Sequence, residues 1–240
     1  MNENLREQWL LLPEYFQGHL LQTLIALSLG IIISIPLGIW AVQSISVKRP
    51  LLIIVSIIQT FPSVAILAMV VSMLGGQIGL IPAIIALVLY SMLPIVRNTV
   101  TGLESVANDV IEAAKGIGMN SSQILIRVRL PLALPMIIAG IRTASVWTVG
   151  LATLSTLVGA TSLGNYIFTG LQTNNLMAVT FGSLSAALMA VVLDSVIGVI
   201  QWLTEHRNQR NKRFKQVRLA VIVTLVLGVS FSGYSLLPKP

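Results

Sequence analysis

Residues 112–131, EAAKGIGMNSSQILIRVRLP, form a polar interruption between apolar runs that are long enough to cross a membrane. Only 10% of the 240 residues are charged and 55% are hydrophobic, whereas soluble domains have about 25% charged residues. No charged residue lies between Arg49 and Arg97, or between Arg142 and Asp194. Because a helix crosses the hydrocarbon core with roughly 20 residues, each run can hold two crossings. The sequence therefore predicts an all-α, polytopic membrane protein.

The apolar runs predict six transmembrane segments, at about 20–42, 51–74, 78–96, 136–158, 177–203 and 219–236. These divide the chain into an N-terminal segment outside the membrane or at its surface (1–19), a transmembrane core (20–203) with a polar loop (97–135), a basic loop (204–218), and a sixth helix with a short tail (219–240). The N-terminus lacks the basic region and cleavage site of a signal peptide, so we expect the first span to be retained. Cysteine is absent, which excludes disulfides and thiolate metal sites.

Basic residues gather on one side of this predicted topology. That side holds Lys48, Arg49, Arg97, Lys115, Arg127, Arg129, Arg207, Arg210, Lys212, Arg213, Lys215 and Arg218, and the other side holds only Arg6 and Lys239. Arg142 is expected near the basic end of the fourth span. Lysine and arginine in short loops mark the cytoplasmic side, so the polar loop is expected in the cytoplasm and both termini outside. We interpret the run 206–218 as a loop that sets this topology and touches lipid, and not as a nucleic-acid site.

The cytoplasmic segment 97–135 has the pattern of two short helices. The first is expected over about 103–115, and Gly116 and Gly118 are expected to end it. Asn120 or Ser121 can cap the second helix, and Pro131 is expected to end it. A helical hairpin on the membrane surface suits a groove on another protein.

The spacing in this hairpin resembles the EAA loop of ABC importer permeases, EAA-x3-G-x9-I-x-LP. The matching residues are Glu112, Ala113, Ala114, Gly118, Val128, Leu130 and Pro131, with valine in place of isoleucine. From about residue 20 to 203 the chain is also similar to OpuC-type and ProW-type permeases, which import glycine betaine, carnitine, choline or proline betaine. Three stretches carry this similarity: QTFPSVAILAM (59–69), LPIVRNTVTGL (93–103) and GIRTASVWTVGLATLSTLVGATSLGNYIFTGL (140–171).

The resemblance implies a type I importer (MetI-like) permease fold of about five core transmembrane helices plus a sixth C-terminal one. It also implies a permease homodimer or heterodimer in a bacterial or archaeal cytoplasmic membrane. Two cytoplasmic ATPases would bind ATP and magnesium and grip the EAA loops, and an extracellular or periplasmic binding protein would deliver the substrate. The chain has no G-x4-G-K-[ST] loop, so it is expected to be non-catalytic and to carry no cofactor.

Two residues of the EAA loop have more than one expected role. Gly118 would allow either a close approach of the ATPase backbone or a positive φ. Glu112 could pair with a basic residue of the ATPase or cap its own loop.

A translocation pathway needs polar groups within the spans, where such groups are costly in lipid. The candidates are Gln59, Thr60, Ser63, Ser91, Thr148, Thr153, Ser155 and Thr156. The stretch Gln59, Thr60, Phe61 and Pro62 is our first choice, because Pro62 frees a backbone carbonyl and can kink the helix. Ordinary hydrogen bonding between helices is the alternative for all of them.

A quaternary ammonium group has no proton to donate, so aromatic faces bind it. Of the four tryptophans, only Trp147 is expected to face a pathway, and no aromatic cage is visible in the sequence. High-affinity recognition would then belong to the binding protein. Asp194, an acid within a span, could pair with Arg142, meet the pathway or bond nearby hydroxyls, and we favour the pair.

Several other functions are compatible with parts of this sequence. Within the ABC importers, the substrate could be ergothioneine, a bile acid or methionine, because nothing in the spans separates these from quaternary amines. An ATP-independent secondary transporter is disfavoured by the EAA spacing and by the lack of inverted repeats with mid-membrane acids. An intramembrane enzyme is disfavoured because the chain lacks paired acids and nucleophile motifs.

Overall fold

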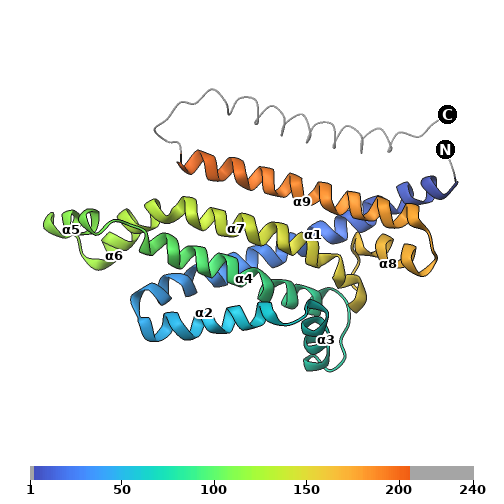
Figure 1. The fold of residues 1–240 in the computed structure, drawn as a ribbon, viewed down its shortest axis with the longest axis horizontal. Helices are drawn as coiled ribbons and strands as arrows, with labels where there is room; N and C mark the ends of the chain where they lie inside the picture. The colour runs from blue at the N-terminus through green and yellow to red at the C-terminus, as the bar shows by residue number, and fades with distance from the viewer. Residues whose placement is uncertain (1–2, 206–240) are drawn as a thin grey trace.

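The computed structural model describes residues 3–205 as a bundle of helices (Figure 1). Within this range there are helices and no strands: α1 (Glu3–Gln43), α2 (Ile45–Thr60), α3 (Ser63–Met73), α4 (Leu80–Glu104), α5 (Asn108–Gly116), α6 (Ser121–Ile124), the π-helical η1 (Leu125–Arg129), α7 (Leu130–Ala152), the 3-10 helix η2 (Leu154–Val158), α8 (Gly164–Gln172) and α9 (Leu176–Glu205). The basic loop 206–218 and the predicted span 219–236 lie outside the described residues.

Four helical stretches in this range are long and apolar enough to span a membrane: Gln8–Gln43, Leu80–Glu104, Ser121–Ala152 and Leu176–Thr204. Helices α2 and α3 together form a fifth candidate, bent by 103° between Thr60 and Ser63. The all-α prediction is confirmed for these residues. The first helix, however, begins at Glu3 rather than near residue 20, because the apolar pattern of 9–20 extends it without a break.

Three predicted boundaries differ from the structure. Segment 51–74 is not one straight span, because Pro62 breaks it into α2 and α3. The first hairpin helix does not start at Leu103, since α4 continues to Glu104 and α5 starts at Asn108. Pro131 does not end the second hairpin helix; it lies in the first turn of α7, and the chain is helical from Ser121 to Ala152. The turns directly before Pro131 are π-helical, with the Leu130 N–H bonded to the Leu125 carbonyl, and this wider turn accommodates the proline without ending the helix.

Helix α4 occupies the centre of the bundle and is buried along its length from Pro82 to Leu103. Small residues let its neighbours approach closely. A Cβ at Gly38 of α1 would lie 2.7 Å from the Thr99 side chain of α4, and one at Gly140 of α7 would lie 2.7 Å from the carbonyl oxygen of Pro94. Small residues at such crossings are typical of helix packing in membranes, where van der Waals contact replaces the hydrophobic effect.

Two polar contacts join α7 to other helices of the bundle. Arg142 of α7 binds both carboxylate oxygens of Asp194 on α9, with Nη2 at 2.6 Å from Oδ2. Arg142 is the thirteenth of the 23 residues of α7, so it lies deeper in the span than the sequence indicated. On α1, buried His19 donates from Nε2 to the Val149 carbonyl at 3.1 Å and accepts the Leu163 N–H at Nδ1.

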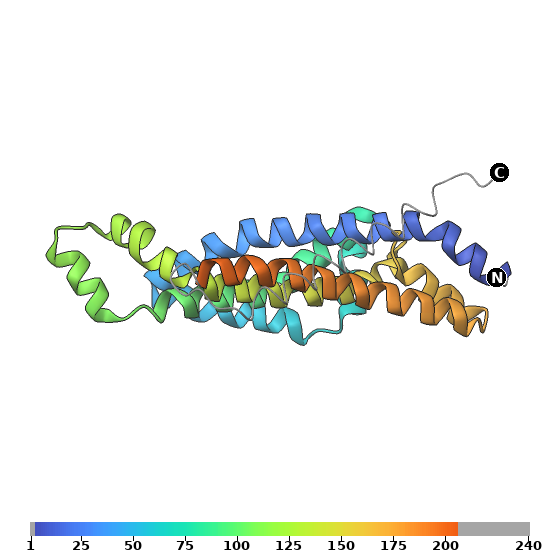
Figure 2. The same ribbon diagram turned by 90° about the horizontal axis from the view of Figure 1, so that it is seen from above.

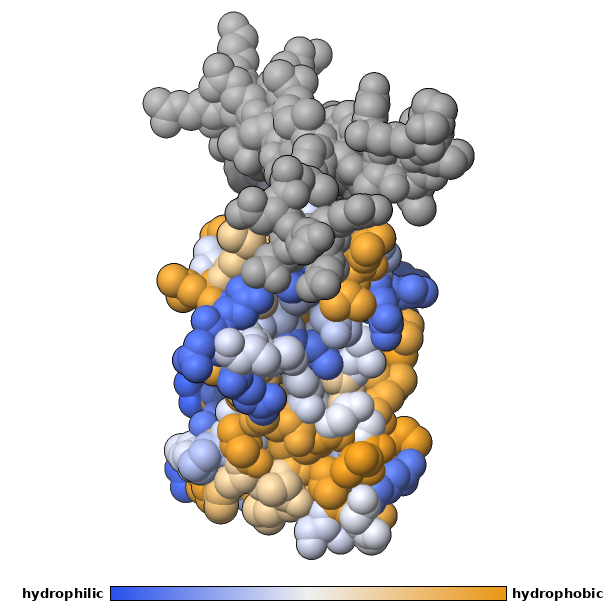
Figure 3. All heavy atoms as spheres, turned by 90° about the vertical axis from the view of Figure 1, so that its right-hand side faces the viewer, coloured by the Kyte–Doolittle hydropathy of each residue, from blue (hydrophilic) through white to orange (hydrophobic). Residues whose placement is uncertain are grey.

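The two ends of the bundle differ in composition. Helices α5 and α6 extend beyond one end, and the start of α1 lies with α8 at the other (Figures 1 and 2). The α5–α6 end includes Lys115, Arg127 and Arg129, whereas α8 carries no charged residue. The surface of that second end mixes hydrophilic and hydrophobic side chains (Figure 3). This segregation is the pattern that the positive-inside rule uses to orient a membrane protein.

Two glycines of α7 provide a matched test of the close packing. A Cβ at Gly140 would lie 2.6 Å from Cβ of Asn98, whereas a Cβ at Gly150 would meet nothing within 4 Å. We expect Gly140→Ala to push α7 away from α4 and to cost about 1–3 kcal/mol. Gly150→Ala should be neutral or slightly stabilising, because alanine favours a helix. Thermal unfolding of the purified protein in detergent checks this; equal melting temperatures for the two variants would contradict the packing described.

Candidate functional site

The loop between α4 and α7 folds into a compact hairpin with its own apolar core. Val106, Ile111, Ala114 and Ile124 are buried in it, and Met119 and Val128 pack against them. Leu130 packs on the neighbouring cluster around Leu103 and Ala133, which belongs to the bundle. Ala114 and Val128 therefore hold the hairpin together, and Leu130 joins it to the spans.

The turn of the hairpin depends on Gly118. Its φ is +83°, a conformation that L side chains rarely adopt, and a Cβ there would meet nothing within 4 Å of the chain. Of the two predicted roles, the positive φ is therefore present within this chain. The Gly118 N–H donates to the Lys115 carbonyl at 2.9 Å, and the Met119 N–H donates to Ala114 at 3.1 Å. These bonds satisfy the last carbonyls of α5.

Asn120 starts the second arm of the hairpin with a capping box. Its side chain accepts the Gln123 N–H at 2.9 Å, and the Gln123 side chain accepts the Asn120 N–H at 2.9 Å. The predicted cap is thus Asn120. Two free N–H groups are satisfied reciprocally, which fixes the direction in which the chain enters the helix.

One face of α5 remains open to solvent. Val110, Ala113 and Ile117 are exposed and spaced for one side of a helix, and Ile117 is 77% exposed. Glu112 is also exposed and has no hydrogen-bond or ion-pair partner among residues 3–205. It does not cap its own loop, so its carboxylate is available to a partner. Val110 and Ile117 thus place exposed apolar side chains on the hairpin outside its own core.

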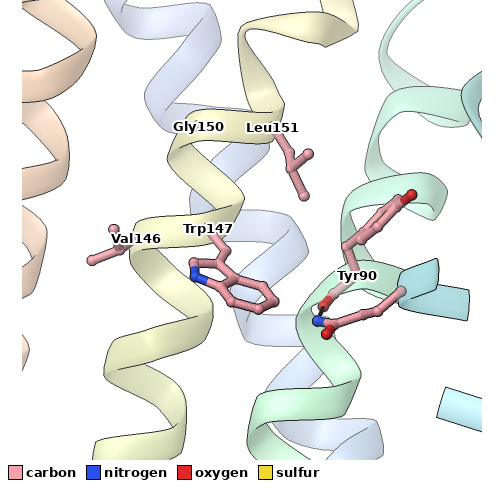
Figure 4. A pocket seen from close by; sticks show the side chains of 6 residues that line it. Tyr90, Val146, Trp147, Gly150 and Leu151 are labelled. Atoms are coloured by element: carbon pink, nitrogen blue, oxygen red, sulfur yellow. Dashed lines mark hydrogen bonds between the residues drawn. The ribbon is translucent and has the colours of Figure 1, made fainter. Parts of the chain in front are cut away.

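A second feature is an open pocket of about 380 Å³ between α2, α4 and α7 (Figure 4). It is lined by Gln59, Tyr90, Val146, Trp147, Gly150 and Leu151. The Trp147 indole reaches from α7 toward Tyr90 on α4, and 47% of the tryptophan is exposed. The structure therefore brings together Gln59 and Trp147, two residues that the sequence proposed separately for the pathway.

Reciprocal hydrogen bonds hold the wall of this pocket. Pro94 has no N–H, so the Tyr90 carbonyl four residues earlier in α4 loses its helical partner. Gln59 of α2 donates its Nε2 to that carbonyl at 3.2 Å. At the bend, the Ala65 N–H donates to Pro62 at 2.9 Å instead of to Phe61. The Tyr90 hydroxyl donates to the freed Phe61 carbonyl at 2.6 Å.

The other residues proposed for the pathway lie around this wall. Thr60, Phe61 and Pro62 are exposed at the bend, and Ser63 is half-buried at the start of α3. Several hydroxyls bond carbonyls of their own helix turn: Thr60 to Ile57, Ser91 to Val88, Thr148 to Ala144, Thr153 to Gly150 and Ser155 to Ala152. Thr156 bonds Ser162 and Asn165. Thr148, Ser91 and Ser155 are buried.

Tyr90 is the functional residue that sequence reasoning missed. A tyrosine in an apolar run resembles any buried aromatic residue. The available signal was Pro94, since a proline within a span orphans the carbonyl four residues before it and so requires a donor on another helix. Gly150 was also missed, because an isolated glycine in a span usually indicates close helix packing rather than a residue that lines a pocket.

The comparisons with known proteins identify the class of this chain. Residues 26–210 match the family described as "Binding-protein-dependent transport system inner membrane component". The chain belongs to this family. The choline transport system permease protein OpuBB of Bacillus subtilis (strain 168) is 42% identical over 183 residues, which are 76% of this chain and 83% of that protein. The glycine betaine/carnitine/choline transport system permease protein OpuCB of the same organism is 41% identical over 183 residues, with the same coverage.

Solved structures agree on the fold. An inward-facing form of the MetNI methionine ABC transporter has a TM-score of 0.75 at 21% identity, covering 85% of this chain and 99% of that chain. As a member of the inner membrane component family, the chain is a non-catalytic permease subunit of an ABC importer, and a partner ATPase hydrolyses ATP. The membership decides against a secondary transporter and an intramembrane enzyme. It also implies ATPase and binding-protein partners and dimerisation.

The reciprocal bonds at the pocket can be tested with two tyrosine variants. Tyr90→Phe leaves the Phe61 carbonyl without its donor, which should cost about 1–3 kcal/mol and lower the melting temperature in detergent by several degrees. Tyr15→Phe is the control, because the Tyr15 ring packs edge-on against Tyr166 and its hydroxyl has no partner in the described part of the chain. A Tyr90→Phe variant as stable as Tyr15→Phe would show that the bond does not hold the bend.

Proposed function

We propose that this chain is the transmembrane permease of an ATP-driven importer of quaternary-amine osmoprotectants such as glycine betaine, carnitine and choline. The observation that carries the proposal is the identity of over 40% to two permeases with these substrates in their names, across most of both chains. The pocket supports it, since its lining is neutral and aromatic. Such a site suits a cation that has no proton to donate.

The hairpin is the proposed contact with the ATPase. Val110, Glu112, Ala113 and Ile117 present the exposed surface, and Ala114, Gly118, Val128, Leu130 and Pro131 give the hairpin its shape and its connection to α7. Two cytoplasmic ATPase subunits, which bind ATP and magnesium, would each receive one hairpin. When ATP closes the ATPase pair, the hairpins would move with it and carry the helical run from Ser121 to Ala152.

The proposed pathway runs along the pocket wall. Gln59 and Trp147 line it, and Thr60, Phe61, Pro62 and Ser63 continue it at the bend. Thr148 and Thr153 turn their hydroxyls to their own helix, so we propose that they act through the shape of α7 rather than by touching the cargo.

The proposed setting is the cytoplasmic membrane of a bacterium or archaeon, with the hairpin inside and both termini outside. The basic side chains near the hairpin support this orientation. A second copy of the chain, or a related permease, would complete the pathway. An extracellular or periplasmic binding protein would deliver the substrate at the end that carries α8.

Gly118 tests the coupling role. Gly118→Asp places a charged side chain where φ is +83°, which strains the turn beside the exposed face of α5. We expect the variant to insert normally and to lose at least tenfold of ATP-dependent uptake. Gly116→Ala is the control, because Gly116 has open space around its Cβ position and no positive φ. Normal uptake by Gly118→Asp would refute the docking model.

The substrate is tested in vesicles that contain the permease with its ATPase and binding protein. We expect uptake of radiolabelled glycine betaine only with ATP, and competition by choline and carnitine but not by ergothioneine. ATPase coupling without betaine uptake would refute the substrate class. Uptake without ATP would refute the coupling.

A further inference from the structure

The Trp147 indole lies at a depth where an interfacial anchor is not expected. It faces Tyr90, which is the eleventh of the 25 residues of α4. At 1.5 Å per residue, Tyr90 is about 15 Å from the outer end of that helix, near the middle of the span. Tryptophans that anchor a protein in a membrane lie at its two surfaces. A half-exposed tryptophan at mid-depth, turned toward a pocket, therefore needs another explanation.

The pocket offers a cation an aromatic face and little else. Its six lining residues include no charged side chain, so an incoming cation cannot form an ion pair there. The Gln59 amide is fixed by its bond to the Tyr90 carbonyl, which leaves Oε1 as an acceptor without a partner among the described residues. The indole face is then the strongest attraction for a quaternary ammonium group, and the amide oxygen is available to a hydroxyl on the same molecule.

Gly150 leaves open space at the wall of the pocket. It lines the pocket one helical turn from Trp147, and a Cβ there would enter open space. The volume of about 380 Å³ falls in the lower range of small-molecule pockets. A weak, neutral site also suits a pathway, because a transported ion must leave the site as readily as it enters.

We propose that Trp147 forms a low-affinity binding site for the quaternary ammonium group within the permease itself, which we call the Trp147 station. Gly150 leaves the space that the group enters. This inference rests on the proposed function for its substrate class. The inference goes beyond the proposed function, because it places part of the selectivity for positive charge in the membrane subunit, in addition to any selectivity of the binding protein.

A thiol-reactivity experiment tests the station without relying on transport. The chain has no cysteine, so Gly150→Cys introduces a single thiol. In the assembled complex, a thiol reagent carrying a trimethylammonium group should react several-fold faster than a neutral reagent of equal length. Adding Trp147→Leu should abolish this preference, and Trp147→Phe should keep part of it. Trp40→Leu is the control, since Trp40 is a 56% exposed tryptophan on α1 outside the pocket. A preference that survives Trp147→Leu would overturn the proposal.

Uptake at saturating loaded binding protein provides the second measurement. Trp147→Leu should lower the maximal rate of choline uptake at least fivefold, Trp147→Phe by less than twofold, and Trp40→Leu not at all. Gly150→Leu, which fills the pocket, should also lower it. Unchanged uptake in Trp147→Leu would contradict the station. If the unmodified protein imports no quaternary amine, the proposed function fails, and the thiol-reactivity ratio alone then decides whether the pocket favours cations.

Discussion

Every backbone carbonyl group inside a bilayer needs a hydrogen-bond donor within the protein. Near Pro62 and Pro94, which interrupt the helical hydrogen bonds, the bonds among Gln59, Tyr90 and Phe61 supply such donors. Pro62 bends α2 away from α3, and Pro94 leaves the Tyr90 carbonyl free in α4. Gln59 of α2 bonds the Tyr90 carbonyl, and the Tyr90 hydroxyl of α4 bonds the Phe61 carbonyl at the bend. The bend is therefore a fixed feature, and it leaves an open pocket beside α7 rather than a continuous packed surface.

The helical run that lines this pocket through α7 also begins in the hairpin that we propose to contact the ATPase. From Ser121 to Ala152 the chain is helical, through the π-turn at Leu125–Arg129 and past Pro131. A displacement of the hairpin is thereby connected to Trp147 without an intervening flexible loop. The pair between Arg142 and Asp194 links α9 to this helical run. Both side chains of this pair are partly exposed, and their contact sets the register of α7 against α9.

Much of this organisation could be predicted from the residues, for reasons that are local. Uncharged runs of sufficient length predicted the spans within the described residues, and Gly118 predicted the turn. The cap was expected at Asn120 or Ser121, and a pair with Arg142 was the favoured role of Asp194. Pro62 predicted a kink in the second span, but neither the 103° size of the bend nor the continuity past Pro131 could be predicted. A proline breaks or begins a helix according to which carbonyls its neighbours can satisfy. Tyr90 was missed for the same reason, as its role depends on the carbonyl of a residue 29 positions away. The proposed roles of Glu112 and Trp147 depend on partners and cargo that lie outside the chain.

The most direct measurement is an electron cryomicroscopy structure of the permease assembled with its ATPase and binding protein, prepared with ATP and choline. The account predicts that α5 lies in a cleft of the ATPase with Ile117 buried. It also predicts that a trimethylammonium group lies within about 6 Å of the Trp147 ring, the range of a cation–π contact. A complex in which α5 remains in solvent, or in which choline passes along another face of the bundle, would contradict it.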